Sequence, residues 1–174
     1  MTQYRRFRVP GGTYFFTVRL QERFGHSLID HVDILRTAYA ECLQRYPFQT
    51  KCIVILPDHL HAIWTLPRGD EDFSSRWQFL KRRFTQISGL TGAVSPSQAA
   101  KGEKGVWQRR FWEHTIRNAA DLDLHQRYCW TDPVRHHLSD SPAHWAFSSI
   151  HRDMRSSLLD PDEIEPVPDG QFGE

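Results

Sequence analysis

The pattern of apolar and polar residues predicts two adjacent β-strands in the middle of the chain. Positions 52–66 are almost entirely apolar or β-branched, and Pro57-Asp58 marks a tight connection within them. Successive side chains of a strand point to opposite faces of a sheet, so His59 and His61 are expected to share one face. The apolar residues beside them are expected to pack on the other face: Leu60, Ala62 and Trp64. Taken alone, the two histidines are better explained by packing or surface exposure than by function.

Further strands and helices flank this central pair. Strands are predicted at 13–20 and 106–117, where β-branched and aromatic residues are frequent. Apolar spacings of three and four predict one helix over 27–46 and a second that begins at Asp72 or Ser74. The second helix has an expected buried stripe and an expected basic outer face: Phe73, Trp77, Leu80, Phe84 and Ile87 inside, and Arg76, Lys81, Arg82 and Arg83 outside. Positions 88–105 lack any periodicity, which predicts a long flexible loop.

A third helix is predicted over 119–131, with Asn118 at its start and Pro133 ending it. Tyr128 and Asp132 are four residues apart, so they lie on the same face of this helix. The macrodipole disfavours an anion such as Asp132 at a helix C-terminus by up to about 1 kcal/mol unless a cation compensates. A nearby metal ion would supply that cation.

Composition restricts the class of protein. The 174 residues are enough for one domain with a sizeable core, which we place at 1–152, followed by an acidic tail at 153–174 that is expected to be disordered. No apolar run is long enough for a membrane span and no signal-peptide pattern is present, so a cytoplasmic location is expected. Three cysteines without metal-type spacing are expected to be reduced and packed: Cys42, Cys52 and Cys129.

Charge is distributed unevenly along the chain. The formal net charge is +1, but the segment from Asp153 onward holds seven acids against one arginine, which leaves about +7 on residues 1–152. This surplus favours a polyanionic partner. Aromatic and arginine residues alternate over 107–112, which suits single-stranded nucleic acid, although at least one of these rings is expected in the core. We also hypothesise that the tail after about Ser156 folds over the basic surface and inhibits it.

Several motifs together resemble the REP-associated tyrosine transposases, a family of single-tyrosine HUH nucleases in which two histidines flank one hydrophobic residue. The resemblance covers about 4–151 in the family's order and spacing. Its motifs are Tyr4-Arg5-Arg6, residues 10–17, 56–61 and 107–114, Tyr128 with Asp132-Pro133-Val134, and Trp145 with Ser148-Ser149. The combination is far more specific than a His-Leu-His triplet, which occurs by chance in many strands.

The resemblance implies an α+β fold and a metal-assisted chemistry. The implied core is a central antiparallel sheet of the ferredoxin-like or RRM-like type, with packed helices and the nucleophilic tyrosine on a C-terminal helix. His59 and His61 would hold a divalent metal, Mg²⁺ or Mn²⁺. Tyr128 would attack a phosphodiester of single-stranded DNA, leaving a 5′-phosphotyrosine link and a free 3′-hydroxyl. His114 matches a family position near the site and is a lesser candidate.

The implied third metal ligand departs from the family pattern. The family carries an amide side chain four residues after the tyrosine, and that position is Asp132 in this chain. A carboxylate suits Mg²⁺ or Mn²⁺ and is expected to bind them more tightly, but its charge makes the ion a poorer Lewis acid. Because a tyrosine hydroxyl with a pKa near 10 is a weak nucleophile, the scissile phosphate has to be activated by such an ion. Mixed nitrogen and oxygen ligands without cysteine argue against structural zinc.

The implied substrate is a REP hairpin with a short adjacent single-stranded stretch, bound in the nucleoid-associated cytoplasm of a bacterium. Basic residues are the candidates for DNA contact, although each is also explained by a solvated surface. They are Arg5, Arg6, Lys81, Arg82, Arg83, Arg109 and Arg110. The sequence is compatible with a monomer or a homodimer.

Three functions follow from these observations. The first is a metal-dependent endonuclease and transposase that nicks and rejoins DNA at REP-type hairpins. The second is a domesticated hairpin-binding protein whose catalysis has been weakened by Asp132. The third is a replication or conjugation-type HUH nickase, which would usually bring further domains. A covalent DNA adduct that depends on Tyr128 separates the first function from the second.

Overall fold

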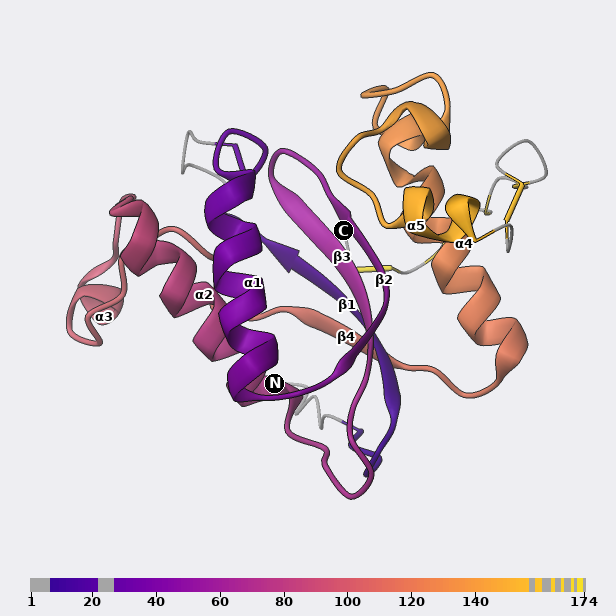
Figure 1. Ribbon diagram of the computed structural model, residues 1–174. Coiled ribbons are helices and arrows are strands. Elements are labelled where there is room, and N and C mark those ends of the chain that lie inside the picture. The colour runs from indigo at the N-terminus through magenta and orange to yellow at the C-terminus, as the bar shows by residue number, and fades with distance from the viewer. Residues whose placement is uncertain are drawn as a thin grey trace.

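The computed structural model describes residues 7–21, 27–156, 159–160, 164, 167, 170 and 172–173. Its core is a four-stranded antiparallel sheet with strands in the order β2-β3-β1-β4, so the predicted α+β class is confirmed (Figure 1). The strands are β1 Thr13–Arg19, β2 Gln49–Ile55, β3 His59–Thr65 and β4 Trp112–Thr115. With helices between β1 and β2 and between β3 and β4, the chain follows the β-α-β-β-α-β arrangement of ferredoxin-like folds.

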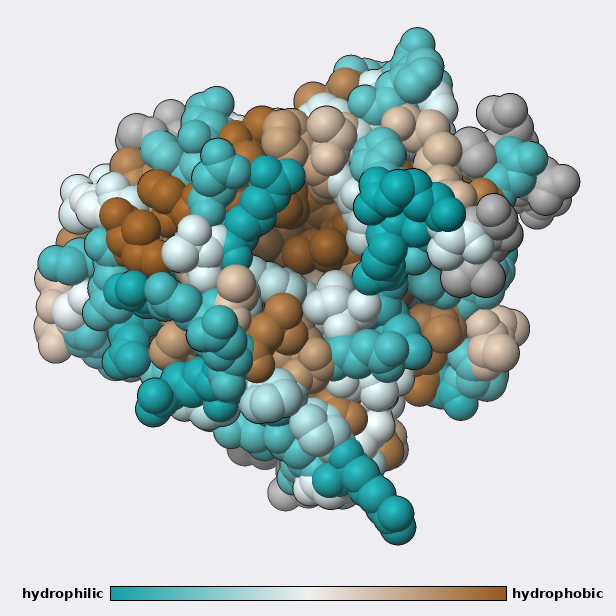
Figure 2. All heavy atoms as spheres, viewed as in Figure 1, coloured by the Kyte–Doolittle hydropathy of each residue, from teal (hydrophilic) through white to brown (hydrophobic). Residues whose placement is uncertain are grey.

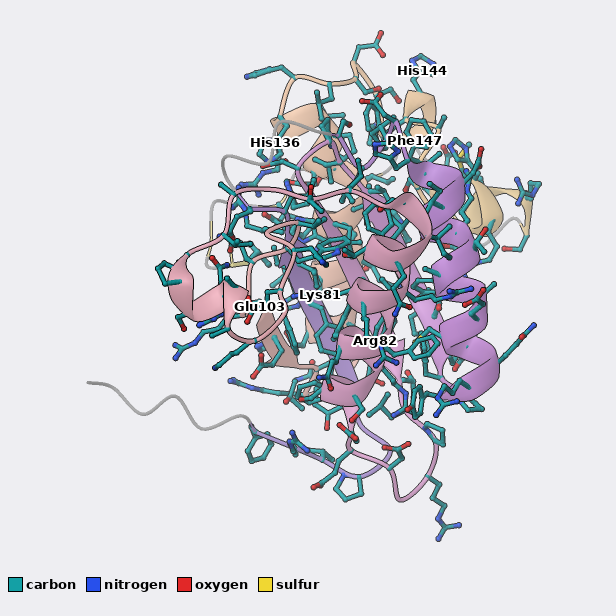
Figure 3. All side chains as sticks on the ribbon, turned by 90° about the vertical axis from the view of Figure 1, so that its left-hand side faces the viewer. Lys81, Arg82, Glu103, His136, His144 and Phe147 are labelled. Carbon is teal, nitrogen blue, oxygen red and sulfur yellow. The ribbon has the colours of Figure 1, made fainter. Side chains whose placement is uncertain are left out.

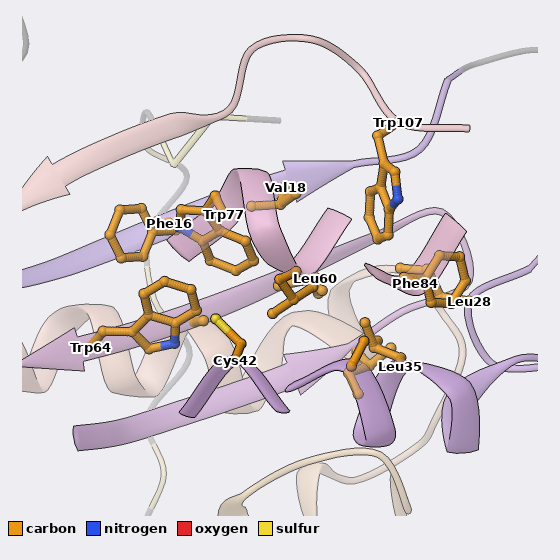
Figure 4. Close-up of a cluster of buried hydrophobic side chains, with 14 of the residues drawn as sticks. Phe16, Val18, Leu28, Leu35, Cys42, Leu60, Trp64, Trp77, Phe84 and Trp107 are labelled. Atoms are coloured by element: carbon orange, nitrogen blue, oxygen red, sulfur yellow. The ribbon is translucent and has the colours of Figure 1, made fainter. Parts of the chain in front are cut away.

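The first face of the sheet is covered by α1 Val32–Arg45 and α2 Phe73–Ser88 (Figure 1). The apolar residues of β3 point to this face as predicted, and all three are buried: Leu60, Ala62 and Trp64. Trp64 stacks on Trp77 of α2, with 4.1 Å between ring centroids and 14° between ring planes. Figure 4 shows these two rings in a continuous apolar core that also contains Phe16 and Phe84.

The second face is covered by α4 Ala119–Arg135 and α5 Ile150–Arg155 (Figure 1). A second apolar cluster lies here, and it includes Phe15, Val54 and Ile63 from the strands. Between the helices, the indole of Trp145 donates a hydrogen bond to the Ile55 carbonyl at 2.9 Å, which fixes the segment around Trp145 on β2. Figure 2 shows apolar side chains around a hollow between the two helical layers, where a cavity of about 310 Å³ lies against α1 and β2.

The first two predicted helices form, with different limits and faces. α1 begins at Val32 because the preceding residues form turns, and α2 begins after Asp72, whose carboxylate accepts a hydrogen bond from the Ser75 amide at 3.0 Å. The prediction for Arg76 is wrong, because its guanidinium is buried and pairs with Asp70 at 2.7 Å. The prediction for Ile87 is wrong in the opposite sense: it was expected in the buried stripe, but it is 36% exposed.

The fourth strand is shorter than predicted. Trp107 forms only an isolated bridge to the end of β1, and regular pairing is confined to β4. The Gln108 carbonyl instead accepts a hydrogen bond from the Lys81 ammonium at 3.0 Å, and Arg109 is paired with Glu103. The preceding loop contains the short helix α3 Pro96–Ala99, which has a capping box at its N-terminus.

The third predicted helix forms as α4, but its end differs from the prediction. Asn118 caps α4 as predicted, but Pro133 lies inside the helix, which continues for two more residues to Arg135. Pro133 is close enough to the end that it removes only a hydrogen bond of the last turn.

All three cysteines are free and buried as predicted. In the described part of the chain, no helix combines the length and apolar character needed to cross a membrane.

The structure describes several residues of the predicted tail, which was expected to begin at 153. α5 runs across that position, and Val167 and Phe172 are buried against the second apolar cluster. The domain boundary itself stays a prediction.

Candidate metal centre and tyrosine site

Two elements bring the predicted site residues together on the second face of the sheet. β3 presents His59 and His61 to that face, and α4 presents Tyr128 and Asp132 one turn apart. The alternation of the strand and the i,i+4 spacing of the helix therefore have the predicted effect. All four side chains are at most 1% exposed.

The Asp132 carboxylate lies between two imidazoles. Its Oδ2 atom is 3.2 Å from Nε2 of His59 and 3.2 Å from Nε2 of His61. Its Oδ1 atom is buried and has no hydrogen-bond partner among the described residues. A buried carboxylate oxygen without a partner is costly, so this atom needs a cation or another donor.

Two further residues fix the orientation of the histidines. Nδ1 of His59 lies 2.7 Å from the Asp58 carboxylate, to which it donates. The Thr17 hydroxyl donates its single hydrogen to the Phe172 carbonyl, so it accepts from Nδ1 of His61 at 2.9 Å. Both rings therefore turn Nε2 toward Asp132, and hydrogen bonds of this kind from the second ring nitrogen are typical of metal-binding histidines.

The same contacts set the charges of the metal-free site. Burial opposes a charge on His59, but hydrogen bonds with Asp132 and Asp58 outweigh it and raise the pKa of His59 to about 9. Burial also opposes ionisation of Asp132, while hydrogen bonds from His59 and His61 hold the pKa of Asp132 well below its usual range. A metal ion bound here at neutral pH would therefore have to displace the proton of His59.

His136 is a candidate ligand that sequence reasoning missed. Its Nε2 atom lies 3.6 Å from Asp132 Oδ1, and suitable ligand atoms of His59, Asp132 and His136 all lie within 4.8 Å of one another. His136 follows Asp132 by four residues, directly after the end of α4, and Figure 3 labels it there. The i,i+4 rule that pairs Tyr128 with Asp132 would also have found it.

This donor set fits a divalent metal ion. The group offers imidazole nitrogens and one carboxylate and contains no described cysteine, since all three pack in the apolar clusters. Imidazole and carboxylate together suit Mn²⁺ and other first-row ions, and a carboxylate alone suits Mg²⁺. The unpartnered Oδ1 of Asp132 is the observation that favours a cation at this place.

Tyr128 is enclosed by aromatic and cationic groups. Its ring lies 5.2 Å from the His61 ring, and the Arg135 guanidinium lies 4.7 Å from the Tyr128 centroid. Phe172 stacks on it at 3.7 Å with 16° between the ring planes. Sequence reasoning missed Phe172, and no pattern in the acidic tail points to it.

His114 lies in a neighbouring group rather than at Asp132. It donates to the Asp121 carboxylate at 2.9 Å, and its ring stacks on His125 at 4.5 Å. Ligand atoms of His114, Asp121 and His125 lie within 4.8 Å of one another, but they are already used in hydrogen bonds. The Asp121 carboxylate accepts from the Arg117 amide, and His125 Nδ1 donates to the Asp121 carbonyl. We therefore interpret this group as a support for the start of α4.

The predicted DNA contacts divide into three sets. Lys81, Arg82 and Arg109 line one groove beside α2. Arg83 pairs with Glu41 of α1, where its Nη2 atom lies 2.9 Å from the carboxylate, and Arg110 is exposed. Arg5 and Arg6 lie outside the described residues.

Comparisons with known proteins give close relatives over the full length. The chain is 41% identical to the REP-associated tyrosine transposase of Escherichia coli K12 over 100% of this chain and 98% of that protein. A relative from Haemophilus influenzae that bears the same family name is 39% identical over 93% of each chain. A solved structure of a REP-associated tyrosine transposase bound to a REP hairpin matches with a TM-score of 0.88 and 41% identity, covering 100% of this chain and 98% of that one. No protein-family model matches.

Proposed function

Because the chain belongs to the REP-associated tyrosine transposases, we propose that it is a metal-dependent endonuclease and strand transferase for single-stranded DNA at REP-type hairpins. The observation that carries this proposal is the juxtaposition of Tyr128 with a buried cluster of imidazoles around a carboxylate. The proposed location is the bacterial cytoplasm, in association with the nucleoid.

Four residues would hold the metal ion. His59, His61 and Asp132 are the ligands that the family pattern suggests, and His136 is close enough to join them. When bound, a divalent ion would polarise the scissile phosphate and offset its charge. Asp58 and Thr17 would keep the two imidazoles in the tautomer that leaves Nε2 free for the ion.

Tyr128 would act as the nucleophile. Its phenol oxygen would form a bond to phosphorus while the bond from phosphorus to the 3′-oxygen breaks, which leaves a 5′-phosphotyrosine link and a free 3′-hydroxyl. The phenol proton leaves to a base and the 3′-oxygen takes up a proton. The Arg135 guanidinium over the ring would favour the phenolate that develops. Because the phosphodiester energy is kept in the protein link, rejoining needs no further energy source.

A hairpin is the proposed DNA partner. The relative of known structure is bound to a REP hairpin, and its 41% identity over the whole chain supports the same substrate class here. The cations beside α2 provide a surface for the phosphate backbone.

A second candidate is a hairpin-binding protein with weakened catalysis. Two observations favour it: an aspartate stands at the position of the family's amide, and Tyr128 is only 1% exposed beneath Phe172. This candidate binds the hairpin but forms no covalent product.

The deciding experiment is a covalent-adduct assay. The protein is incubated with end-labelled hairpin DNA and Mn²⁺, and a protein–DNA adduct is sought by denaturing electrophoresis. We expect an adduct that is absent in Tyr128→Phe and in the presence of a chelator. Intact hairpin binding without any adduct would contradict the nuclease and favour the binding protein.

A further inference from the structure

His125 is a buried imidazole of α4 that lies one helical turn before Tyr128. It is 5% exposed, and its spacing of three residues from Tyr128 puts both side chains on the same face of the helix. Both rings also contact Phe15 of β1, whose ring centroid lies 4.9 Å from that of His125 and 6.0 Å from that of Tyr128. The imidazole and the phenol therefore line one region of the second apolar cluster.

One ring nitrogen of His125 is fixed and the other is available. Its Nδ1 atom lies 2.8 Å from the Asp121 carbonyl, which can only accept, so Nδ1 carries a hydrogen. In a neutral imidazole the other nitrogen is then an acceptor. This Nε2 atom forms no hydrogen bond with any residue that the structure describes. The tautomer of His125 thus leaves a proton acceptor one turn from the nucleophile.

The surroundings of His125 keep its ring uncharged at neutral pH. Burial lowers the pKa of His125, the hydrogen bond to the Asp121 carbonyl opposes this change, and a charge on His114 lowers the pKa further. The titratable groups packed around the ring, within the described residues, are His114 of β4, which stacks on it at 4.5 Å, and Asp121 and Tyr128 of α4. A neutral imidazole is the form that can take up a proton.

The Phe172 ring occupies the space between the imidazole and the phenol. It stacks on Tyr128 at 3.7 Å and meets His125 at 5.3 Å with 72° between the ring planes. A space that holds a benzene ring also holds a water molecule, and a base can act through one water as well as by direct contact. Once this ring moves aside, the two side chains therefore face a common space.

The other candidate groups beside Tyr128 have different roles in the proposed chemistry. His59, His61 and His136 would bind the metal ion, and a nitrogen that binds a metal has no lone pair left for a proton. The Arg135 guanidinium is a cation, so it cannot act as an acceptor. Among the imidazoles described near Tyr128 on the second face, His125 is the one whose acceptor nitrogen is not claimed by the metal or by a hydrogen bond.

We propose that His125 is the general base that takes the phenol proton from Tyr128, directly or through one water. The inference rests on the proposed function and names the proton acceptor for it. As the phenol oxygen bonds to phosphorus and the bond to the 3′-oxygen breaks, the phenol proton moves to Nε2 of His125, while solvent supplies a proton to the 3′-oxygen. On rejoining, the 3′-hydroxyl attacks phosphorus and gives its proton to solvent, and the imidazolium returns its proton to the departing phenolate.

The test is chemical rescue of His125→Ala in the adduct assay with hairpin DNA and saturating Mn²⁺. At pH 7 the rate of adduct formation should fall about 100-fold, while hairpin binding measured by fluorescence anisotropy stays as in the wild type. Imidazole added to the buffer should raise the rate of the variant about tenfold, and substituted imidazoles of higher pKa should raise it further. A purely structural role of His125 does not predict a dependence on the basicity of the added imidazole.

The matched control is His114→Ala, which removes the stacked neighbour of His125. Because His114 donates to the Asp121 carboxylate and offers no base to Tyr128, added imidazole should not raise the rate of this variant. Equal rescue of both variants would overturn the assignment to His125. The wild-type rate, measured with saturating Mn²⁺ at each pH, should fall about tenfold per pH unit below the pKa of His125, which lies under about 6.5, and His125→Ala should lose this dependence.

The tautomer gives a readout that does not depend on activity. Nitrogen-15 NMR of histidine-labelled protein should show Nε2 of His125 without a hydrogen at pH 7. A protonated ring, or a hydrogen on Nε2, would overturn the base whatever the adduct assay gives. An adduct that forms in His125→Ala at the wild-type rate overturns only the base, whereas a wild-type protein that binds the hairpin and forms no adduct overturns the proposed chemistry.

Discussion

The two faces of β3 differ in chemistry although their residues alternate along one strand. On the first face, Leu60 and Trp64 are enclosed by aromatic rings from α1 and α2. On the second face, His59 and His61 are equally buried but surround a carboxylate with an unpartnered oxygen. Burial stabilises the first set and costs free energy for the second unless a charge partner is present. The first face thus maintains the fold, while the second is arranged for a ligand.

The strongest test of this contrast is Leu60→Ala, between the two histidines. Leu60 is 1% exposed in the first cluster, so its truncation should lower the free energy of unfolding by about 2–5 kcal/mol. Urea denaturation of the metal-free protein measures this loss. Because Leu60 points away from the cluster, Mn²⁺ affinity of the folded variant, from titration calorimetry, should equal that of the wild type. Weakened metal binding would contradict the separation of the two faces.

The pH dependence of metal binding tests the second face. His59 has its pKa raised to about 9 in the metal-free protein, so its imidazole is protonated at neutral pH and the ion has to displace that proton. Affinity should therefore rise nearly tenfold per pH unit from 7, reach about 50-fold by pH 9, and level off near about 100-fold above. Mg²⁺ titration across this range measures it. In Asp58→Asn, which removes one of the two carboxylates beside His59, the plateau should begin at lower pH. A flat profile would contradict the protonated imidazole.

Asp132→Asn introduces the amide that the resemblance implies for the family, at nearly the same size. Loss of the charge should weaken Mn²⁺ binding about tenfold, or about 1.4 kcal/mol, and should increase the rate of adduct formation at saturating metal because the ion is then a better Lewis acid. Calorimetry and the adduct assay measure the two effects. Asp123→Asn, on an exposed position of the same helix, is the matched control. A variant that loses both affinity and adduct would indicate that the carboxylate is required.

The difference between the faces also explains which features were predictable. Periodicity placed His59 with His61 and Tyr128 with Asp132, because these relations depend only on the strand and helix repeats. The start of β4 was not predictable, since the Gln108 carbonyl accepts its hydrogen bond from Lys81 of a helix distant in the sequence. Arg76 was predicted on the exposed face because the apolar spacing of the helix puts it there. Its ion pair with Asp70, a residue outside the helix, allows it to be buried.

Substitution of His136 tests whether this residue is one of the metal ligands on the second face. His136→Gln should weaken Mn²⁺ binding about threefold, a modest loss because the residue lies at the exposed edge of the cluster, 3.6 Å from Asp132. Co²⁺ absorption, which depends on the number of nitrogen ligands, should change in the same variant. His144→Gln is the control, since that histidine pairs with Asp140 on the surface. An unaltered Co²⁺ spectrum would exclude His136 from the metal's ligands.

The smallest expected effect concerns the tail, for which charge and stacking make different predictions. If acidic residues screen the basic surface, truncation after Ser156 should increase hairpin binding and Phe172→Ala should not. If the Phe172 ring instead covers the nucleophile, as its 3.7 Å stacking on Tyr128 suggests, Phe172→Ala should raise the adduct rate about twofold without changing hairpin affinity, an effect within about 1 kcal/mol for one aromatic pair. Val167→Ala, another buried tail residue, is the control. Unchanged adduct formation and binding in both the truncation and Phe172→Ala would contradict inhibition by the tail.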